Sequence, residues 1–157
     1  MQRHRAEGST ETLREAAEQL AAAGEAIAAL VREAAAPVEP RLSPHGLRVL
    51  SVVSARPGRN LTSVAAAVGL GLPRASRVCA ALESAGLLLR GPTDGDRRAI
   101  GLQLSQEGSA FLERFRRSRV DRAAAVLRRM PADERGALVT ALGELVLAVA
   151  AVGSERG

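Results

Sequence analysis

Asp96, Arg97 and Arg98 form the most informative cluster of charged residues in this chain of 157 residues. Guanidinium groups bind phosphate oxygens through paired N–H donors, and a neighbouring carboxylate restricts the conformations of an arginine side chain. The cluster precedes a segment, ending at Leu104, in which apolar residues alternate with others. Because a period of two is typical of a half-buried strand, we expect these charges at the tip of a β-hairpin. The alternative is a surface ion pair worth at most ~1 kcal/mol.

A second group of arginines lies in residues 72–84, which have the apolar periodicity of a helix. The expected inward face consists of Ala75, Val78, Cys79 and Leu82. The expected contact residues at the start of this helix and on its outer side are Leu72, Pro73, Arg74, Ser76 and Arg77. Two guanidiniums and a hydroxyl suit phosphate groups or the edges of bases, and the alternative is an ordinary solvated helix surface.

The elements around these residues follow a recognisable order. We expect helices at residues 43–55, 61–68 and 72–84, then hairpin arms at 87–90 and 100–104. Asn60 is a good N-cap for the second of these helices, and Gly86 is a good C-terminal stop for the third. The order predicts a winged helix–turn–helix at residues 43–104, a unit whose second helix enters the major groove of DNA.

Positive charge is concentrated in the middle third of the chain. Residues 41–98 carry nine arginines and three acidic residues, a net charge of +6. Residues 1–40 have a net charge of −3, and residues 99–157 have a net charge of +2. A basic middle segment indicates a polyanionic partner, here double-stranded DNA, and a generally solvated basic surface is the alternative.

The composition favours helices, because much of the 46% apolar fraction is Ala, Leu and Val and there is no Trp or Tyr. We expect a mainly α fold with a small β-hairpin wing. In domain terms we expect a disordered N-terminus at residues 1–8 and a single domain at 9–157, with helical regions at 9–36 and 106–152. These flanking helices are either surface helices or a dimerisation region that packs against a second chain.

The sequence indicates a soluble, cytoplasmic protein that does not contact a membrane. A single cysteine, Cys79, excludes an internal disulfide and fits a reducing compartment. The N-terminal residues are polar and charged, unlike a signal peptide. The most apolar run, residues 142–152, contains Glu144 and spans only ~17 Å as a helix, which is too short for a bilayer.

No catalytic or metal-binding constellation is visible in the sequence. We find no Ser/His/Asp set and no glycine-rich phosphate loop, and His4, His45 and Cys79 lack the spacing of metal ligands. We therefore predict that the protein is not an enzyme and uses no metal and no cofactor. A redox role for Cys79 is disfavoured, because a cysteine on the inner face of a helix behaves as a small hydrophobe.

Several segments together resemble the MarR family of bacterial transcription regulators. They are residues 42–50 (LSPHGLRVL), 76–88 (SRVCAALESAGLL), 96–100 (DRRAI), 102–108 (LQLSQEG) and 131–135 (PADER). The resemblance extends over residues ~10–150 in the order of the family. The Asp-Arg-Arg hairpin, followed by the Leu-x-Leu-Ser-x-x-Gly helix start, is its most specific part. Gly71 departs from the family, which commonly has a Ser or Thr cap there.

The resemblance implies a homodimer whose terminal helices form the interface. It also implies that the 72–84 helix enters the major groove and that the hairpin wing reaches the adjacent minor groove. In that arrangement Asp96 orients Arg98 for insertion, and Arg97 is available for a backbone phosphate. Two recognition helices would then read a pseudo-palindromic operator with half-sites about 10 bp apart.

The resemblance further implies a small-molecule effector between the dimer arm and the DNA-binding lobe. The candidate lining residues are Arg41, His45, Phe111 and Phe115, although a Phe pair one helical turn apart is more often part of the core. The function predicted from the sequence is a dimeric, sequence-specific regulator, with ligand-responsive repression as its mode. The alternative is a winged-helix protein-interaction module that has lost DNA binding.

Overall fold

The computed structural model describes the backbone of residues 2–93 and 96–154, and the side chains of residues 12–91 and 100–152. The described chain contains six helices and a two-stranded antiparallel hairpin. This result confirms the predicted fold class, which is mainly α with a small β wing.

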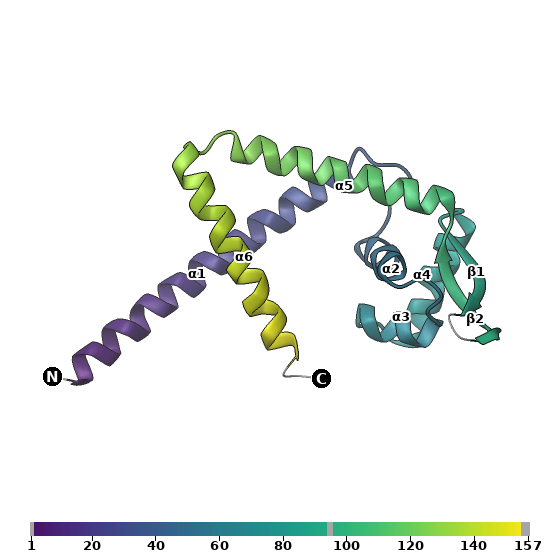
Figure 1. The fold of residues 1–157 in the computed structure, drawn as a ribbon, viewed down its shortest axis with the longest axis horizontal. Coiled ribbons are helices and arrows are strands. Elements are labelled where there is room, and N and C mark those ends of the chain that lie inside the picture. Colours follow the sequence, from purple (N-terminus) through teal and green to yellow (C-terminus); the bar gives the residue numbers. More distant parts are fainter. Residues whose placement is uncertain (1, 94–95, 155–157) are drawn as a thin grey trace. The chain divides into compact units, whose positions relative to one another are not determined.

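The elements follow the predicted order (Figure 1). The helices are α1 (Gln2–Ala35), α2 (Pro44–Ala55), α3 (Leu61–Val68), α4 (Leu72–Ser84), α5 (Gln106–Leu127) and α6 (Ala132–Ser154). The strands are β1 (Leu88–Thr93) and β2 (Asp96–Leu104). The chain divides into two compact units, of which the first ends at Arg119 and the second begins at Val120.

Helix α1 begins at Gln2, which differs from the disordered segment expected at residues 1–8. The physical reason lies in the composition of residues 2–7. Gln, Arg, Ala and Glu all have high helix propensity, and this stretch contains no proline to stop a helix.

Side-chain caps fix where α2 and α3 begin. The Ser43 hydroxyl accepts a hydrogen bond from the Gly46 N–H at 3.1 Å at the start of α2. The Asn60 side chain accepts one from the Ser63 N–H at 2.9 Å at the start of α3. Each cap satisfies a backbone donor that has no partner inside its helix. The helix starts predicted at these two positions are therefore confirmed.

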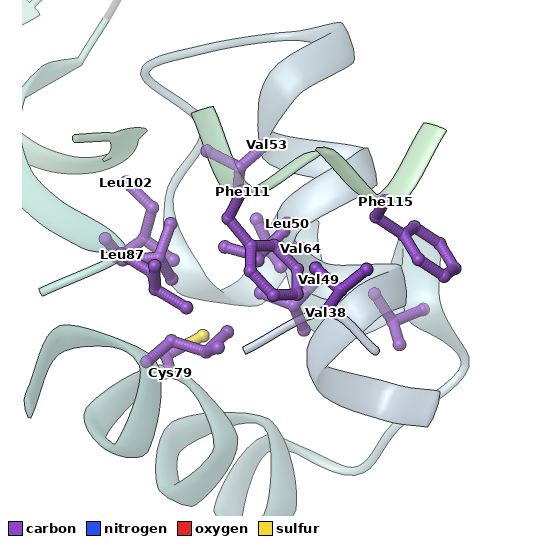
Figure 2. Close-up of a cluster of buried hydrophobic side chains, with 13 residues drawn as sticks. Val38, Val49, Leu50, Val53, Val64, Cys79, Leu87, Leu102, Phe111 and Phe115 are labelled. Atoms are coloured by element: carbon purple, nitrogen blue, oxygen red, sulfur yellow. The ribbon is translucent and has the colours of Figure 1, made fainter. Parts of the chain in front are cut away.

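The core of the first unit lies where α2, α3 and α4 meet the hairpin and the first half of α5 (Figure 2). Its largest fully buried side chains are Phe111, Leu50, Leu87, Leu88, Leu102, Val49, Val53, Val64 and Cys79. Phe111 is 1% exposed and Phe115 is 6% exposed, so both rings belong to this cluster. The core holds the helix–turn–helix and the hairpin against each other.

Two hydrogen bonds connect the first half of α5 to the segment where α1 ends. The Ser118 hydroxyl donates to the Ala34 carbonyl at 2.8 Å, and the Arg114 guanidinium donates to the Glu39 carbonyl at 3.4 Å. Ala34 and Val38 are buried beside them. These contacts hold the loop that precedes α2 in a defined position.

Helix α6, in the second unit, is apolar over most of its surface. Its exposed large apolar side chains are Val139, Leu142, Val146, Leu147, Val149 and Val152. The 21-residue segment Ala132–Val152 has a mean hydropathy of 1.8 and is long and apolar enough to cross a membrane by length and composition alone. The prediction from the sequence counted only residues 142–152, and it therefore underestimated the length of the apolar helix. A single such helix is weak evidence for a membrane span, because apolar helices of soluble proteins pass the same test.

Candidate nucleic-acid interface

A tight glycine turn positions helix α4 after α3. Gly69 has φ +72°, a left-handed conformation that residues with a side chain rarely adopt. The Leu70 N–H donates to the Ala65 carbonyl at 3.0 Å, which closes the end of α3. Gly71 then begins α4 without any side-chain cap, and Pro73 occupies its first turn.

The inward face of α4 agrees with the sequence prediction. Ala75, Cys79 and Leu82 are buried, and Val78 packs against the core while remaining partly exposed. Burial of these side chains fixes the rotation of the helix about its own axis. The opposite side of the helix is therefore held toward solvent.

The predicted contact residues of α4 lie on or beside this solvent-facing side. Leu72 is 49% exposed, and Pro73, Arg74 and Arg77 are also exposed. Ser76 is half-buried, so it lies on the flank of the helix. In the part of the chain that the structure describes, neither guanidinium is paired with a carboxylate. Their charges and donors are therefore available to an anionic partner.

The hairpin is anchored to the loop between α2 and α3. Leu102 of β2 exchanges two backbone hydrogen bonds with that loop: the Gly58 N–H donates to the Leu102 carbonyl at 2.9 Å, and the Leu102 N–H donates to the Arg59 carbonyl at 2.8 Å. A Cβ atom on the neighbouring Gly101 would overlap the carbonyl of Gly58. The close approach needs glycine at position 101, a requirement that sequence reasoning missed.

An ion pair connects the end of α4 to the start of the hairpin. The Arg90 Nε donates to Glu83 Oε2 at 3.1 Å, and Arg90 Nη2 lies 3.0 Å from Glu83 Oε1. The Nε contact is a charge-assisted hydrogen bond, which is directional as well as charged. Sequence analysis did not identify this pair, and the spacing of seven residues across a turn at Gly86 is the only signal that suggests it.

The tip of the hairpin carries the predicted Asp96, Arg97 and Arg98. Their backbone belongs to β2. Asp96 pairs with Thr93, and Arg97 and Arg98 lie in the irregular stretch between this pair and the Pro92–Ile100 pair. Their side chains lie outside the described residues. The roles expected for these three side chains therefore stay predictions.

The residues predicted to line an effector pocket lie in different places in the described structure, and the pocket itself stays a prediction. Phe111 and Phe115 fill the core, which is the alternative that the sequence left open. Arg41 lies elsewhere, on a groove of about 310 Å³ between the start of α2 and helix α4. His45 is partly exposed on α2 and does not line that groove.

Cys79 is a packing residue rather than a reactive thiol. Its side chain is fully buried. Burial raises the pKa of the Cys79 thiol above its ordinary value of 9.0; the nearby Glu83 carboxylate raises it further and Arg90 lowers it. The thiol is therefore protonated at neutral pH, and protonated thiols are poor nucleophiles. Among the described residues, no group of three or more His, Cys, Asp and Glu side chains lies close enough to hold a metal ion.

Comparison with known sequences gives no match, either to a protein-family model or to a curated protein. Comparison with solved structures gives many matches along most of the chain. The transcriptional repressor CouR, solved with a 23-mer DNA duplex, is 31% identical to this chain. The match covers 82% of this chain and 89% of CouR, with a TM-score of 0.60.

Two further structures share the fold at lower identity. RV1404 from Mycobacterium tuberculosis is 24% identical with a TM-score of 0.75, and the match covers 84% of this chain and 90% of RV1404. A MarR family protein from Bacillus stearothermophilus is 16% identical with a TM-score of 0.77, and the match covers 89% of this chain and 96% of that protein. Both likenesses concern the arrangement of helices and hairpin.

Proposed function

Because this chain belongs to the MarR family of transcriptional regulators, we propose that it acts as a homodimeric, sequence-specific repressor whose DNA affinity responds to a small molecule. The observation that carries the proposal is the outer side of α4. Two exposed guanidiniums, which have no carboxylate partner among the described residues, lie at the start of this helix, and the buried face of the helix fixes its rotation about its own axis. The relative that is 31% identical is a repressor solved on DNA.

In the proposed complex, α4 enters the major groove of the duplex. Arg74 and Arg77 are one helical turn apart, so both reach the groove from the same side of the helix. Each guanidinium can make a bidentate contact with guanine or hold a phosphate. Leu72 and Ser76 complete the contact surface, because an apolar side chain suits a thymine methyl and a hydroxyl suits either a base or a phosphate.

The wing provides the second contact. Arg98 enters the minor groove, where a narrow groove concentrates negative potential, and Asp96 restricts its side chain. Arg97 contacts the phosphate backbone beside it. The anchored strand β2 supports this proposal, since the bonds between Leu102 and the α2–α3 loop hold the hairpin at a fixed angle to the helix–turn–helix.

The apolar surfaces of the terminal helices support a homodimer. Helix α1 exposes Leu13, Leu20 and Ile27, and helix α6 exposes the six large apolar side chains named above. Apolar area of this extent is normally covered in a soluble protein. We assign its cover to the terminal helices of a second copy, and we propose that the dimer is soluble and cytoplasmic. Two copies of α4 then read a pseudo-palindromic operator with half-sites about 10 bp apart.

The proposal includes no catalytic activity. The competing function is a winged-helix module that has lost DNA binding and acts through protein contacts. The exposed Arg74 and Arg77 argue against it, because two guanidiniums with no carboxylate partner among the described residues suit the phosphate groups of DNA.

Selection of bound duplexes from a random pool tests the proposed function. We expect the pool to converge on an inverted repeat that binds the protein at least about 1,000-fold more tightly than a scrambled duplex of the same length. A pool that keeps no common sequence after repeated rounds would favour the protein-interaction module.

A further inference from the structure

A groove on the flank of α4 is the strongest unassigned feature of the DNA-binding lobe. It has a volume of about 310 Å³. It is lined by Arg41, Leu42, Ser43, Gly46, Arg74, Arg77, Val78, Ala81 and Leu82. We infer that this groove holds one phosphate of the DNA backbone together with its deoxyribose, so that Arg41 is a third point of contact with the duplex. The inference rests on the proposed function and adds a contact outside the helix–turn–helix and the wing.

The charge of the groove is complementary to a phosphate. Three of its lining residues are arginines and none is acidic. The only carboxylate described beside these arginines is that of Glu39, whose Oε1 lies 3.5 Å from Arg41 Nε. Both side chains of that pair are more than 70% exposed, so the pair is weak and a phosphate can replace the carboxylate.

The backbone around Arg41 is held in position before any ligand arrives. Glu39 Oε2 accepts a hydrogen bond from the Arg41 N–H at 3.1 Å, and the Glu39 carbonyl accepts one from Arg114 of α5 at 3.4 Å. Ser43 caps α2 at the other end of this short segment. The segment therefore presents the guanidinium of Arg41 from a fixed base, which lowers the entropy cost of binding.

The floor of the groove is apolar, and this property fits a nucleotide better than an isolated anion. Leu42, Val78 and Leu82, which are less exposed than the arginines, provide its apolar lining. The carbon atoms of a deoxyribose provide an apolar surface next to each phosphate. Small-molecule pockets bury ~70–90% of their ligand. Here the three arginines, Ser43 and Ala81 are exposed, so the groove is open along its rim and suits a strand that passes through.

A contact of this kind positions the protein without reading sequence. Phosphate contacts fix the register of a protein on the duplex, whereas contacts with base edges provide specificity. Arg41 should therefore contribute affinity equally on all sequences. Arg74 and Arg77 lie between this phosphate and the bases, and they help to form both the groove and the recognition surface.

The test compares the full-length wild type with Arg41→Ala by fluorescence anisotropy on several unrelated duplexes, at salt concentrations between about 50 and 200 mM. Loss of one phosphate contact lowers the slope of log affinity against log salt by about 0.9 per subunit. The ratio of the wild-type DNA affinity to that of Arg41→Ala should therefore fall about 3.5-fold per subunit between the lowest and the highest salt concentration. The fall should be the same on every duplex.

Two further variants make the result specific. Arg117→Ala is the matched control, because Arg117 is also exposed and is paired with Glu113 at 3.3 Å, but does not line the groove. It should bind DNA like the wild type. Glu39→Gln removes the competing carboxylate and should strengthen binding about 1.4- to 5-fold, a gain that damage to the fold would not produce.

Each failure has a separate meaning. If the wild type shows no salt-dependent binding to any duplex, the proposed function itself fails. If the wild type binds and Arg41→Ala retains its affinity and slope, or loses affinity on one sequence only, the phosphate contact is wrong. If benzoate or inorganic phosphate binds the free protein through Arg41, while Arg41→Ala leaves DNA affinity unchanged, the groove is a small-anion site and the inference is overturned.

Discussion

Replacement of Gly101 by alanine tests how the wing is held. The added Cβ would overlap the Gly58 carbonyl oxygen, which belongs to the backbone and cannot turn away as a side chain can. The Gly58–Arg59 segment must therefore move, and its two hydrogen bonds with Leu102 must lengthen or break.

The expected cost follows from these contacts. Overpacking in a closely packed region costs about 1–3 kcal/mol, and each lost backbone hydrogen bond costs about 0.5–1.5 kcal/mol. We therefore expect Gly101→Ala to lower the free energy of unfolding by about 2–6 kcal/mol, a large part of the ~5–15 kcal/mol that stabilises a typical domain. DNA affinity should fall as well, because the hairpin loses its anchor.

Gly91→Ala is the matched control, since Gly91 is the cross-strand partner of Gly101. The three atoms nearest to a Cβ at position 91 belong to the side chain of Gln103, at 3.2–3.4 Å, and none of them is a backbone atom. We expect its free energy of unfolding to stay within about 1 kcal/mol of the wild type. Urea unfolding followed by circular dichroism measures both variants. Equal stability of Gly101→Ala and the wild type, or an equal loss in the two variants, would refute the reasoning.

Three further predictions concern the wing, the core and the dimer. Arg98→Ala should weaken operator binding by ~1–3 kcal/mol, most strongly where the flanking sequence is A·T-rich. Titrations at fixed salt measure this loss, and an unchanged affinity would contradict the role assigned to the wing. The folded protein should lose stability as pH rises above about 9, because the unfolded Cys79 thiol ionises there while the buried one stays protonated. Urea unfolding across this pH range measures the loss of stability, which should be smaller in Cys79→Ala. An identical pH dependence in both proteins would contradict the attribution of this loss to Cys79. Val146→Arg places a charge at an exposed apolar position of α6 and should convert the dimer to a folded monomer, as measured by analytical ultracentrifugation. If the variant stays dimeric, this face of α6 is not part of the dimer interface.

Much of the fold follows from local signals in the sequence. The caps at Ser43 and Asn60 and the glycine turn after Val68 are formed by residues close together in the chain, so their positions can be predicted. The inward face of α4 was predictable for a similar reason, because helical periodicity separates buried from exposed positions over a single element.

Contacts between distant segments could not be predicted in this way. The Gly58–Leu102 bond joins residues in a loop and a strand, and no periodicity connects them. The placement of Arg41 is another case. Sequence reasoning grouped it with Phe111 and Phe115, but the packing of the α1–α2 loop against α5 places it beside Arg74 and Arg77 on the groove.

The fold of this chain persists in proteins whose sequences differ widely from it. The segments that carry the resemblance are short, and apolar positions such as Leu82 and Leu102 tolerate exchange among similar residues. The fold is kept by core volume and by a few turns, which is why structural likeness persists at 16% identity.

The central claim is that two copies of this chain present α4 and the wing to one duplex. The most direct test is titration of the purified protein with its selected duplex, with stoichiometry and affinity measured at several salt concentrations. We predict two protomers per duplex and a plot of log affinity against log salt that falls with a slope of roughly −5 or steeper, as expected for six or more phosphate contacts. A single protomer per duplex, or no binding in dilute buffer, would contradict the account.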